Sequence, residues 1–257
     1  MIYEADRQVK NKLNPMFESM DDTIIFSCLQ GHLGTAWVDD LENPSVAQII
    51  VGIFVIYAGD PHTKEAEEMV RNLPEFALVI GETDEWKQLI ETVHQDSAEK
   101  FQRYRFEKNP DHLDRTHIQN IISPLPEGYE MKKIDKAIAN EPSLHKVSED
   151  FISQFDSVED FLARGTGFAV VKDGKVVCGA TSYSIYDEGI EIEVATHPDH
   201  RGKGLATITS ATLIEDCLDK GLYPSWDAAN ETSVHMAKKF GYKFKESYDT
   251  YCIERSS

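Results

Sequence analysis

Hydrophobic residues alternate with other residue types from Ile190 to Thr196, and they recur at a longer period after Gly204. The first stretch, Ile-Glu-Ile-Glu-Val-Ala-Thr, has the period of two that is typical of a β-strand. Pro198 lacks a backbone donor and therefore ends this strand. Apolar and small residues from Leu205 onward repeat at helical spacing. The pattern predicts a strand, a glycine-containing turn and a helix.

The N-terminal half consists of short apolar runs separated by turn residues. An amphipathic helix over residues 6–20, interrupted at Pro15, and a second short helix ending at Cys28 are predicted first. Strands are predicted over 35–38, 46–50, 53–57, 76–80 and 101–106, and helices over 63–72 and 85–93. This order of elements resembles that of the second half. We therefore expect the first half to be a degenerate copy of the same fold.

The second half follows a proline-containing stretch at residues 109–128. Strands are predicted over 129–134, 168–171, 176–185 and 224–228, and helices over 135–139, 158–164, 205–220 and 231–240. Two last strands, 242–245 and 248–253, are expected to close as a hairpin. The domain boundary is placed near residues 124–128, which gives an N-terminal domain of residues 1–125 and a second domain of residues 126–257.

Composition narrows the classes of function. Hydrophobic residues make up 41% of the 257 residues, which is enough for a packed core. The 45 acidic and 26 basic residues give a net charge of −19. This charge argues against nucleic acid or an anionic membrane surface as a partner and favours a cationic small molecule. The longest apolar stretch, Ile49 to Ala58, is too short to span a bilayer.

The cysteines and the first residues bear on the cellular compartment. Cys28, Cys178, Cys217 and Cys252 are scattered, without a C-x-x-C pair or a zinc-binding spacing, so no metal site is predicted. The first seven residues are polar and charged, unlike a signal peptide. We expect a cytoplasmic protein with reduced, buried thiols. The oligomeric state is left open, with a homodimer among the options.

The turn before the predicted helix at 205–220 has the properties of an anion-binding site. A helix N-terminus exposes unpaired N–H groups and carries a partial positive charge, which attracts phosphate groups. The absence of a Cβ at Gly202 and Gly204 allows the backbone to approach a diphosphate closely. A Rossmann-type turn fits less well, because no G-x-G-x-x-G sequence follows the strand in the required order.

Two motifs in this region resemble the GNAT superfamily of acetyl-CoA-dependent N-acyltransferases. Arg201-x-x-Gly204-x-Ala206, after a strand and a Thr-His-Pro turn, resembles the family motif Arg/Gln-x-x-Gly-x-Gly/Ala. Asn230 and Ser233, followed by Gly-Tyr at positions 241–242, match a later family motif in spacing. The resemblance covers about residues 129–257. Within the superfamily, Gly-Leu-Tyr-Pro-Ser-Trp-Asp-Ala-Ala-Asn and the long N-terminal half look like the branch typified by the zwittermicin A resistance acetyltransferase.

The resemblance implies an α/β (α+β) fold with a mixed central sheet flanked by helices. It implies a catalytic GNAT domain at residues 126–257 and a degenerate GNAT-like domain at residues 1–125. The glycine turn is missing from the first half, where Gly59-Asp60-Pro61-His62-Thr63 has one glycine and a proline. The first half is therefore expected to support the catalytic half or to border the substrate pocket, without binding phosphate.

The cofactor implied by the resemblance is acetyl-CoA. Backbone N–H groups of the turn and first helical residues would bind its diphosphate, with added charge from Arg201 and Lys203. The backbone of the strand end would pair with the pantetheine amides where neighbouring parallel strands separate, and Asn230 and Ser233 would contact the pantetheine arm. The expected cofactor-binding residues are Val194, Ala195, Thr196, Arg201, Gly202, Lys203, Gly204, Leu205, Ala206, Asn230 and Ser233.

Acetylation of an amine requires a base, because a primary amine with a pKa near ~10 is mostly protonated at neutral pH. Glu191 and Glu193 alternate with apolar residues, so both carboxylates face one side of the strand. Two close carboxylates can also raise the pKa of one of them by mutual repulsion. Both glutamates are candidate bases. The alternative is that one of them only binds a substrate cation or forms a cross-strand ion pair.

A general acid for the departing thiolate is harder to assign. The family often uses a tyrosine seven residues after the motif asparagine, and Ala237 occupies that position here. Tyr248 and Tyr251, in the predicted last hairpin, are candidate acids by location, and His235 is another. Thiolate departure without a dedicated acid is the alternative.

These features predict an acetyl-CoA-dependent N-acetyltransferase that acts by direct transfer on a primary amine of a small molecule. One alternative is a protein or peptide N-acetyltransferase on the same fold. The other is a non-catalytic acyl-CoA-binding sensor, which the alanine at position 237 favours.

Overall fold

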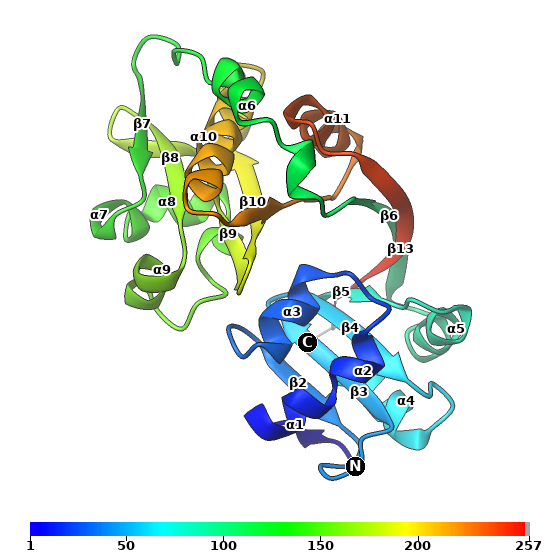
Figure 1. The fold of residues 1–257 in the computed structure, drawn as a ribbon. Helices are drawn as coiled ribbons and strands as arrows, with labels where there is room; N and C mark the ends of the chain where they lie inside the picture. Colours follow the sequence, from blue (N-terminus) through cyan, green and yellow to red (C-terminus); the bar gives the residue numbers. More distant parts are fainter. Residues whose placement is uncertain (255–257) are drawn as a thin grey trace. The chain divides into compact units, whose positions relative to one another are not determined.

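The structure is a computed structural model that describes residues 1–254, and the chain forms two compact units (Figure 1). Unit 1 comprises Met1–Arg103 together with the end of the chain from Ser247, and unit 2 comprises Tyr104–Glu246. Strands β6 (Ala98–Phe106) and β13 (Phe244–Glu254) each contribute residues to both units.

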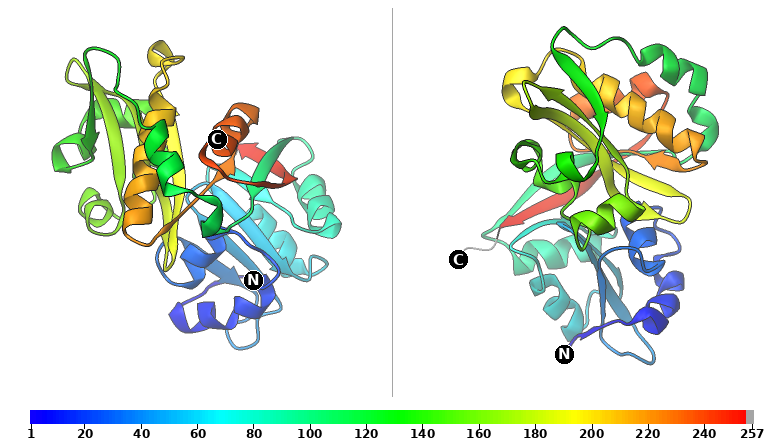
Figure 2. Two further views of the ribbon diagram at one scale, coloured as in Figure 1. Left: turned by 45° about the horizontal axis from the view of Figure 1, so that its top comes forward. Right: turned by 90° about the vertical axis from the view of Figure 1, so that its left-hand side faces the viewer.

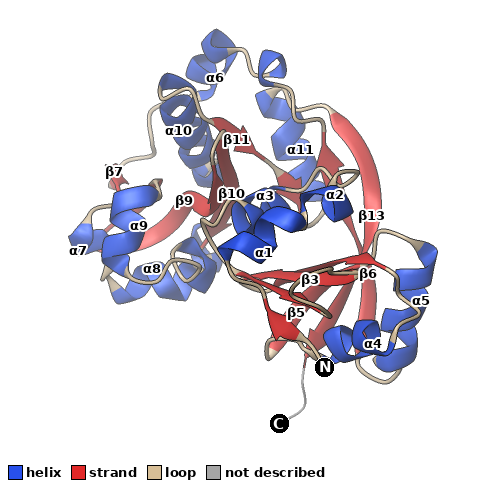
Figure 3. Cartoon of the chain, turned by 60° about the horizontal axis from the view of Figure 1, so that its bottom comes forward, coloured by secondary structure: helices blue, strands red, loops and turns tan. Residues whose placement is uncertain are grey.

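Unit 1 contains a mixed sheet with helices on both faces (Figure 3). Its strands occur in the order β1-β2-β3-β4-β5-β13-β6, in which β4 and β5 are parallel and are joined through helix α4. Its elements before β6 are β1 (Tyr3–Glu4), α1 (Arg7–Lys12), α2 (Asn14–Phe17), α3 (Thr23–Leu29), β2 (Thr35–Val38), β3 (Val46–Val51), β4 (Phe54–Gly59), α4 (Lys64–Arg71), β5 (Phe76–Ile80) and α5 (Asp84–Val93). The predicted elements of the first half are confirmed to within a few residues.

The end of the chain belongs to unit 1, which corrects the predicted terminal hairpin. β13 is one continuous strand, and its residues Tyr251–Glu254 pair antiparallel with β5. Tyr251 and Ile253 are each 1% exposed and complete a core that also contains Tyr57 and Trp86. The two aromatic rings of Tyr57 and Trp86 stack with centroids 4.8 Å apart. The hairpin prediction failed because the polar run around Glu246 looks like a turn but lies within the strand.

Unit 2 is built on a five-stranded sheet of order β11-β10-β9-β8-β7. The parallel pair β10 and β11 is joined through helix α10, as β4 and β5 are joined through α4 in unit 1. Its elements are η1 (Pro110–His112), α6 (Arg115–Ile121), β7 (Tyr129–Lys133), α7 (Lys136–Ala139), α8 (Pro142–Val147), η2 (Glu149–Phe151), α9 (Val158–Arg164), β8 (Gly167–Lys172), β9 (Lys175–Tyr186), β10 (Gly189–Thr196), η3 (Pro198–His200), α10 (Leu205–Asp219), β11 (Tyr223–Ser225), β12 (Asp227–Ala228) and α11 (Glu231–Phe240). The repeated order supports the expectation of an internal copy.

Helices cover both faces of the unit 2 sheet, α10 on one face and α8 with η2 on the other (Figure 2). Neighbouring residues of β9 mark the two faces, because successive strand side chains point in opposite directions. The thiol of Cys178 lies 3.6 Å from the Thr209 hydroxyl of α10. A Cβ on Gly179 would instead lie 2.7 Å from the ring of Phe151 in η2. Helix α8 and η2 were missing from the sequence prediction.

The predicted domain boundary near residue 125 lies inside unit 2. Helix α6 precedes that position but packs against α10. The Gln119 amide donates to the Glu215 carboxylate at 2.7 Å, and the His117 ring contacts the Lys239 carbonyl oxygen at 2.8 Å. The chain therefore passes from one compact unit to the other within β6 and within β13, not at the proline-containing stretch.

Among residues 1–254, none of the helices has the length and hydropathy needed to cross a bilayer. In the same residues, no group of three or more His, Cys, Asp or Glu side chains is placed to hold a metal ion. The four cysteines are free thiols, and only Cys252 is not fully buried.

Candidate functional site

Strand β10 is paired along its whole length with β9 but only at its start with β11. The three parallel pairs run from Gly189–Tyr223 to Glu191–Ser225. After Trp226 the chain leaves this sheet, and β12 pairs with β6 instead. Within residues 1–254, the backbone from position 192 to position 196 therefore has ladder partners on the β9 side only. The predicted edge of Val194, Ala195 and Thr196 lies in this separated, half-buried part of the strand.

The turn between η3 and α10 presents backbone N–H groups to solvent. Gly202 and Gly204 have φ angles of 76° and 74°, and a Cβ on either glycine would meet nothing within 4 Å. Gly204 is the N-cap of α10, and no side chain caps this helix. Among the residues that the structure describes, the first backbone bond of the helix runs from Ile208 N–H to the Gly204 carbonyl oxygen at 3.1 Å. The preceding N–H groups point out of the helix without a capping acceptor.

The corresponding turn in unit 1 is closed by its own side chains. Thr63 caps helix α4 by accepting the N–H of Ala66 at 3.0 Å, and Asp60 accepts the N–H of His62 at 2.9 Å. Thr63 and Asp60 thus bind backbone N–H groups at the turn before α4, whereas no side chain caps the start of α10. The sequence prediction that this turn does not bind phosphate stays a prediction, and the capping supports it.

The first residues of α10 anchor the turn in the core of unit 2. Leu205 is 2% exposed and packs with Val170, Val177 and Cys178, and Ala206 packs against this cluster. The hydroxyl of Thr196 donates to the Cys178 sulfur at 3.2 Å, which links the end of β10 to the same cluster. The side chain of Leu205 is thus buried, while no side chain caps the backbone N–H groups of the helix start.

Arg201 and Lys203 are exposed and lie on either side of Gly202. The Nε of Arg201 donates to the Thr196 carbonyl oxygen at 3.2 Å, which ties the turn to the end of β10. The ammonium of Lys203 donates to the Asp199 carbonyl oxygen at 3.3 Å. Both contacts are to neutral carbonyl groups, so both positive charges remain available to an anion at the turn.

Asn230 and Ser233 are engaged in local structure. The Asn230 side chain caps α11 by accepting the Ser233 N–H at 3.0 Å. The Ser233 hydroxyl accepts the indole N–H of Trp226 at 3.1 Å. Helix α11 contacts α10 through Met236, whose sulfur accepts the Thr207 hydroxyl at 3.8 Å. These residues hold the start of α11 in place next to the α10 turn.

Glu191 and Glu193 lie on the face of β10 that is turned away from α10. Thr196 contacts Cys178 on the α10 face, so odd-numbered residues of β10 point to the η2 face. Across the strands, Glu193 pairs with Thr181 and Glu191 pairs with Ser184, two residues with fully buried side chains. The register shift between these pairs adds a residue to β9 only, so the alternation along β10 is uninterrupted and both carboxylates lie on one face. The structure therefore brings the two predicted glutamates together, as the alternation implied.

Ser148 is a residue of this site that the sequence analysis missed. Its hydroxyl donates to Glu193 Oε1 at 3.0 Å. The sequence Ser-Glu-Asp at 148–150 has the form of a helix N-cap, which could have been recognised. Its contact with a strand 45 positions later depends on the tertiary fold and has no sequence signal.

A buried polar cluster closes the paired end of β10 and β11. The hydroxyls of Tyr186 and Ser225 are 3.1 Å apart, and both residues are at least nine-tenths buried. Burial raises the pKa of Tyr186 far above its ordinary value, with a smaller contribution from the negative charge of Glu191. Tyr186 therefore stays neutral at physiological pH. This tyrosine was also missed, because its strand pattern resembles that of any core aromatic.

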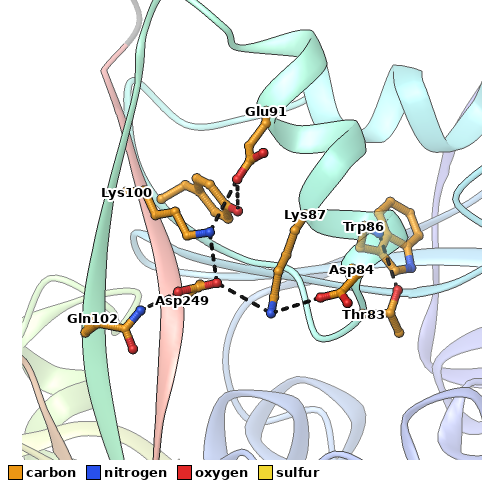
Figure 4. Close-up of polar contacts among 9 residues, drawn as sticks. Thr83, Asp84, Trp86, Lys87, Glu91, Lys100, Gln102 and Asp249 are labelled. Carbon is orange, nitrogen blue, oxygen red and sulfur yellow. Dashed lines mark hydrogen bonds and ion pairs between the residues drawn. The ribbon is translucent and has the colours of Figure 1, made fainter.

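Tyr248 and Tyr251 belong to the part of β13 that lies in unit 1, whereas the two glutamates belong to unit 2, so the role of either tyrosine as an acid stays a prediction. The Tyr251 hydroxyl donates to Glu91 Oε1 at 2.6 Å, beside the charged network drawn in Figure 4. Burial and this carboxylate raise the pKa of Tyr251 to about 12. The structure thus gives Tyr251 a role in the core of unit 1. Tyr248 is half-buried in the same strand, and its role as an acid stays a prediction.

Ala237 is fully buried inside α11. A tyrosine at this position would need space that the core does not provide without rearrangement. His235 is exposed, and its ring contacts the Glu231 carbonyl oxygen of its own helix at 2.6 Å. Neither position supplies an evident proton donor for a thiolate.

Comparison with known proteins agrees with this arrangement. A family model described as GNAT acetyltransferase matches residues 14–251, which is most of the chain. An uncharacterized N-acetyltransferase of Bacillus subtilis (strain 168), YdfB, is 28% identical over 265 residues, with 98% of each chain covered.

Solved structures give the same result. A GCN5-related N-acetyltransferase-like protein from Streptococcus suis 89/1591 is 36% identical with a TM-score of 0.87, over 95% of this chain and 98% of that chain. A tandem GNAT protein from the clavulanic acid biosynthesis pathway is 10% identical with a TM-score of 0.58 over 100% of both chains, a likeness of fold alone. The predicted α/β fold of mixed sheets flanked by helices is confirmed. The chain belongs to the GNAT acetyltransferase family.

Proposed function

We propose that the protein is an acetyl-CoA-dependent N-acetyltransferase that transfers an acetyl group to a primary amine of a small molecule. The observation that carries this proposal is the uncapped N-terminus of α10, placed directly after the part of β10 that separates from β11. A phosphate-binding helix start and an unpaired strand edge lie on consecutive segments of one chain.

The residues of the α10 turn fit the diphosphate of coenzyme A. The N–H groups before Ile208 have no side-chain cap, and the helix start carries a partial positive charge. Nothing lies within 4 Å of the positions where Gly202 and Gly204 would carry a Cβ, so the backbone can be approached closely. Arg201 and Lys203 add two positive charges. The separated edge at Val194–Thr196 would hold the pantetheine amides.

Removal of a proton from the amine is the task that the chain's own side chains would perform. When bound, acetyl-CoA supplies the thioester carbonyl that the amine attacks. A Lys-like amine with a pKa near ~10 must first lose its proton, because the protonated form has no lone pair. Glu193 and Glu191 share a face of β10 and would accept this proton directly or through water.

A cationic small molecule is the acceptor that these features favour. Two carboxylates on one strand face attract an ammonium group, and the net charge of −19 acts in the same direction. The sequence resemblance to the zwittermicin A resistance branch also supports a small aminated molecule, met in the cytoplasm. A cationic side chain of a peptide would satisfy the same carboxylates, so the assay below includes peptides.

A second function, acyl-CoA binding without turnover, is favoured by one observation. The position that holds a tyrosine acid in many family members is Ala237, which is fully buried, and the candidate acid Tyr251 lies in the core of unit 1. A sensor of this kind would keep the α10 turn and bind coenzyme A. It would release no thiol with any amine.

A thiol-release assay with acetyl-CoA and a panel of polyamines, amino sugars, amino acids and lysine peptides tests both functions. We expect turnover with a small cationic amine, and loss of at least a hundredfold in kcat/KM for Glu193→Gln, the order of magnitude that a general base contributes. Calorimetry with coenzyme A is run in parallel. Binding without thiol release from any amine would favour the sensor, and absence of binding would exclude both.

A further inference from the structure

Ser148 makes two hydrogen bonds at the junction of α8 and η2. Its Oγ accepts the backbone N–H of Asp150 at 3.3 Å and lies 3.0 Å from Glu193 Oε1. A serine hydroxyl carries one proton, and a backbone N–H can only donate. The single proton of Ser148 is therefore directed at the Glu193 carboxylate.

The position of Ser148 is fixed by the packing of η2 on the sheet. Phe151, the last residue of η2, is fully buried. Its ring lies so close to Gly179 that a Cβ on this glycine would be 2.7 Å from the ring. Gly179 and Thr181 are neighbours on one face of β9, opposite Ala195 and Glu193 respectively. A missing side chain on β9 thus allows η2 to approach closely, and this approach brings Ser148 to the carboxylate.

We propose that Ser148 is a positioning residue that holds the Glu193 carboxylate ionised and in one orientation. This inference rests on the proposed function in one respect, the role of Glu193 as the base. A hydrogen bond donated to a carboxylate stabilises the charged form, and the bond to Oε1 fixes the orientation of the carboxylate.

Other titratable groups lie on β10 itself and on the elements packed around it. They are Glu191 on the same strand, Glu149 and Asp150 on η2, His145 and Lys146 on α8, Tyr183 and Tyr186 on β9, and Tyr223 on β11. Burial raises the pKa of Asp150, while a hydrogen bond from Gln154 acts in the opposite direction. The carboxylates in this set repel a negative charge at position 193. The Ser148 hydroxyl offsets this repulsion locally.

Titration of Glu193 by ¹³C NMR tests the inference without any need for turnover. The Cδ signal of Glu193 is assigned by its loss in Glu193→Gln and is then followed with pH in the full-length protein. In Ser148→Ala we expect the pKa of Glu193 to rise by about 1, the equivalent of one lost hydrogen bond to a charged group. Ser148→Thr keeps the hydroxyl and should titrate as the wild type does.

Ser157→Ala is the matched control. Ser157 caps the neighbouring helix α9 by accepting the Asp160 N–H at 3.1 Å, so this variant loses a serine N-cap of the same kind. It should leave the titration of Glu193 unchanged. An unchanged titration in folded Ser148→Ala, or an equal change in Ser157→Ala, would overturn the inference. Should Ser148→Ala fail to fold, Ser148→Cys keeps the size of the side chain with a weak donor and takes its place.

Kinetics separates this inference from the proposed function. With an active amine, the acidic limb of the pH profile of kcat/KM in Ser148→Ala should move to higher pH. The shift should equal the rise in the pKa of Glu193 measured by NMR. If the NMR titration moves and the kinetic limb does not, Ser148 still positions Glu193, and the role of Glu193 as base is wrong. If no amine is acetylated, the proposed function fails, and the NMR titration still decides whether Ser148 holds Glu193.

Discussion

Gly204 and Gly221 lie just outside opposite ends of α10, and both have left-handed backbone conformations, with φ angles of 74° and 70°. A Cβ on either glycine would meet nothing within 4 Å. They therefore share the same backbone requirement, but only Gly204 lies at the helix start, where N–H groups are exposed. This pair separates the cost of a strained conformation from the cost of a disturbed binding site.

Gly204→Ala is predicted to weaken coenzyme A binding about tenfold, because a non-glycine residue in the left-handed region costs roughly 1–2 kcal/mol and the turn can relax away from its binding geometry. Gly221→Ala should lose similar stability but bind coenzyme A as the wild type does. Isothermal titration calorimetry gives the affinities and urea unfolding gives the stabilities. Equal weakening in both variants would contradict a role for the α10 N-terminus.

Gly179 makes a different demand, since its conformation is ordinary and its limit is space. A Cβ there would lie 2.7 Å from Phe151 Cζ and 2.8 Å from Cε2. Gly179→Ala is predicted to destabilise the protein by about 1–3 kcal/mol through overpacking. The smaller side chain of Phe151→Leu should recover part of this loss in the double variant, as measured by urea unfolding of the four proteins. Additive losses would show that the two residues do not compete for the same volume.

Strand β13 shows how far local pattern predicts an element. The pattern of its apolar residues correctly predicted two extended segments, 242–245 and 248–253. The residues between these segments are polar or charged, which is typical of a turn. The strand is continuous because its residues 251–254 pair with β5 while β6 lies next to it on the other side in the sheet. Pairing of this kind is non-local and leaves no trace in the spacing of hydrophobic residues.

A charged network at Asp249 attaches β13 to the neighbouring elements of unit 1 (Figure 4). Lys100 lies 3.0 Å and Lys87 lies 3.5 Å from Asp249 Oδ2, and the Gln102 amide donates to Oδ1. Burial acts to raise the pKa of Asp249, but the bonds from Lys100 and Gln102 and the charges of both lysines outweigh it and lower the pKa. The folded state therefore favours the ionised form of this side chain.

Asp249→Asn is predicted to cost on the order of 1 kcal/mol of unfolding free energy at pH 7. The native pKa lies below that of the unfolded chain, so the stabilisation is present above about pH 4 and is lost as the pH falls through the native pKa. The difference between wild type and variant should narrow below about pH 4 in urea unfolding. Asp84→Asn is the control, because Asp84 contacts the same Lys87 but is 98% exposed. If the difference in unfolding free energy between wild type and Asp249→Asn is independent of pH, the ionised Asp249 carboxylate is not the source of the stabilisation.

The site itself was predictable only where its residues are close in sequence. Strand, proline, glycines and helix follow one another at positions 190–219, so the α10 turn and the shared face of Glu191 and Glu193 follow from periodicity alone. The contact from Ser148 to Glu193 spans 45 positions and depends on how η2 packs on β9. The place of Tyr251 in the core of unit 1 is non-local in the same way, because it depends on the pairing of β13 with β5.

Unit 1 is built from two separate chain segments, and this has a consequence for folding. Residues 1–125 lack β13, although Tyr251 and Ile253 belong to the core of unit 1. Loss of one such buried side chain costs about 2–5 kcal/mol, which is a large part of the stability of a domain. A fragment of residues 1–125 is therefore predicted to lack a cooperative unfolding transition by circular dichroism.

A redesigned fragment provides the matched comparison. The N–H of Glu107 donates to the Lys243 carbonyl oxygen at 2.9 Å, so the chain ends at these two positions are adjacent. Joining residues 1–107 to residues 243–257 through Asn-Gly, which favours a tight hairpin turn, restores β13 beside β6 without most of unit 2. This fragment should unfold cooperatively in urea, and Ile253→Ala within it should lower its midpoint. If residues 1–125 unfold as cooperatively as the joined fragment does, the last strand is dispensable to unit 1, and the boundary near residue 125 describes the folding unit better than a unit 1 of two chain segments does.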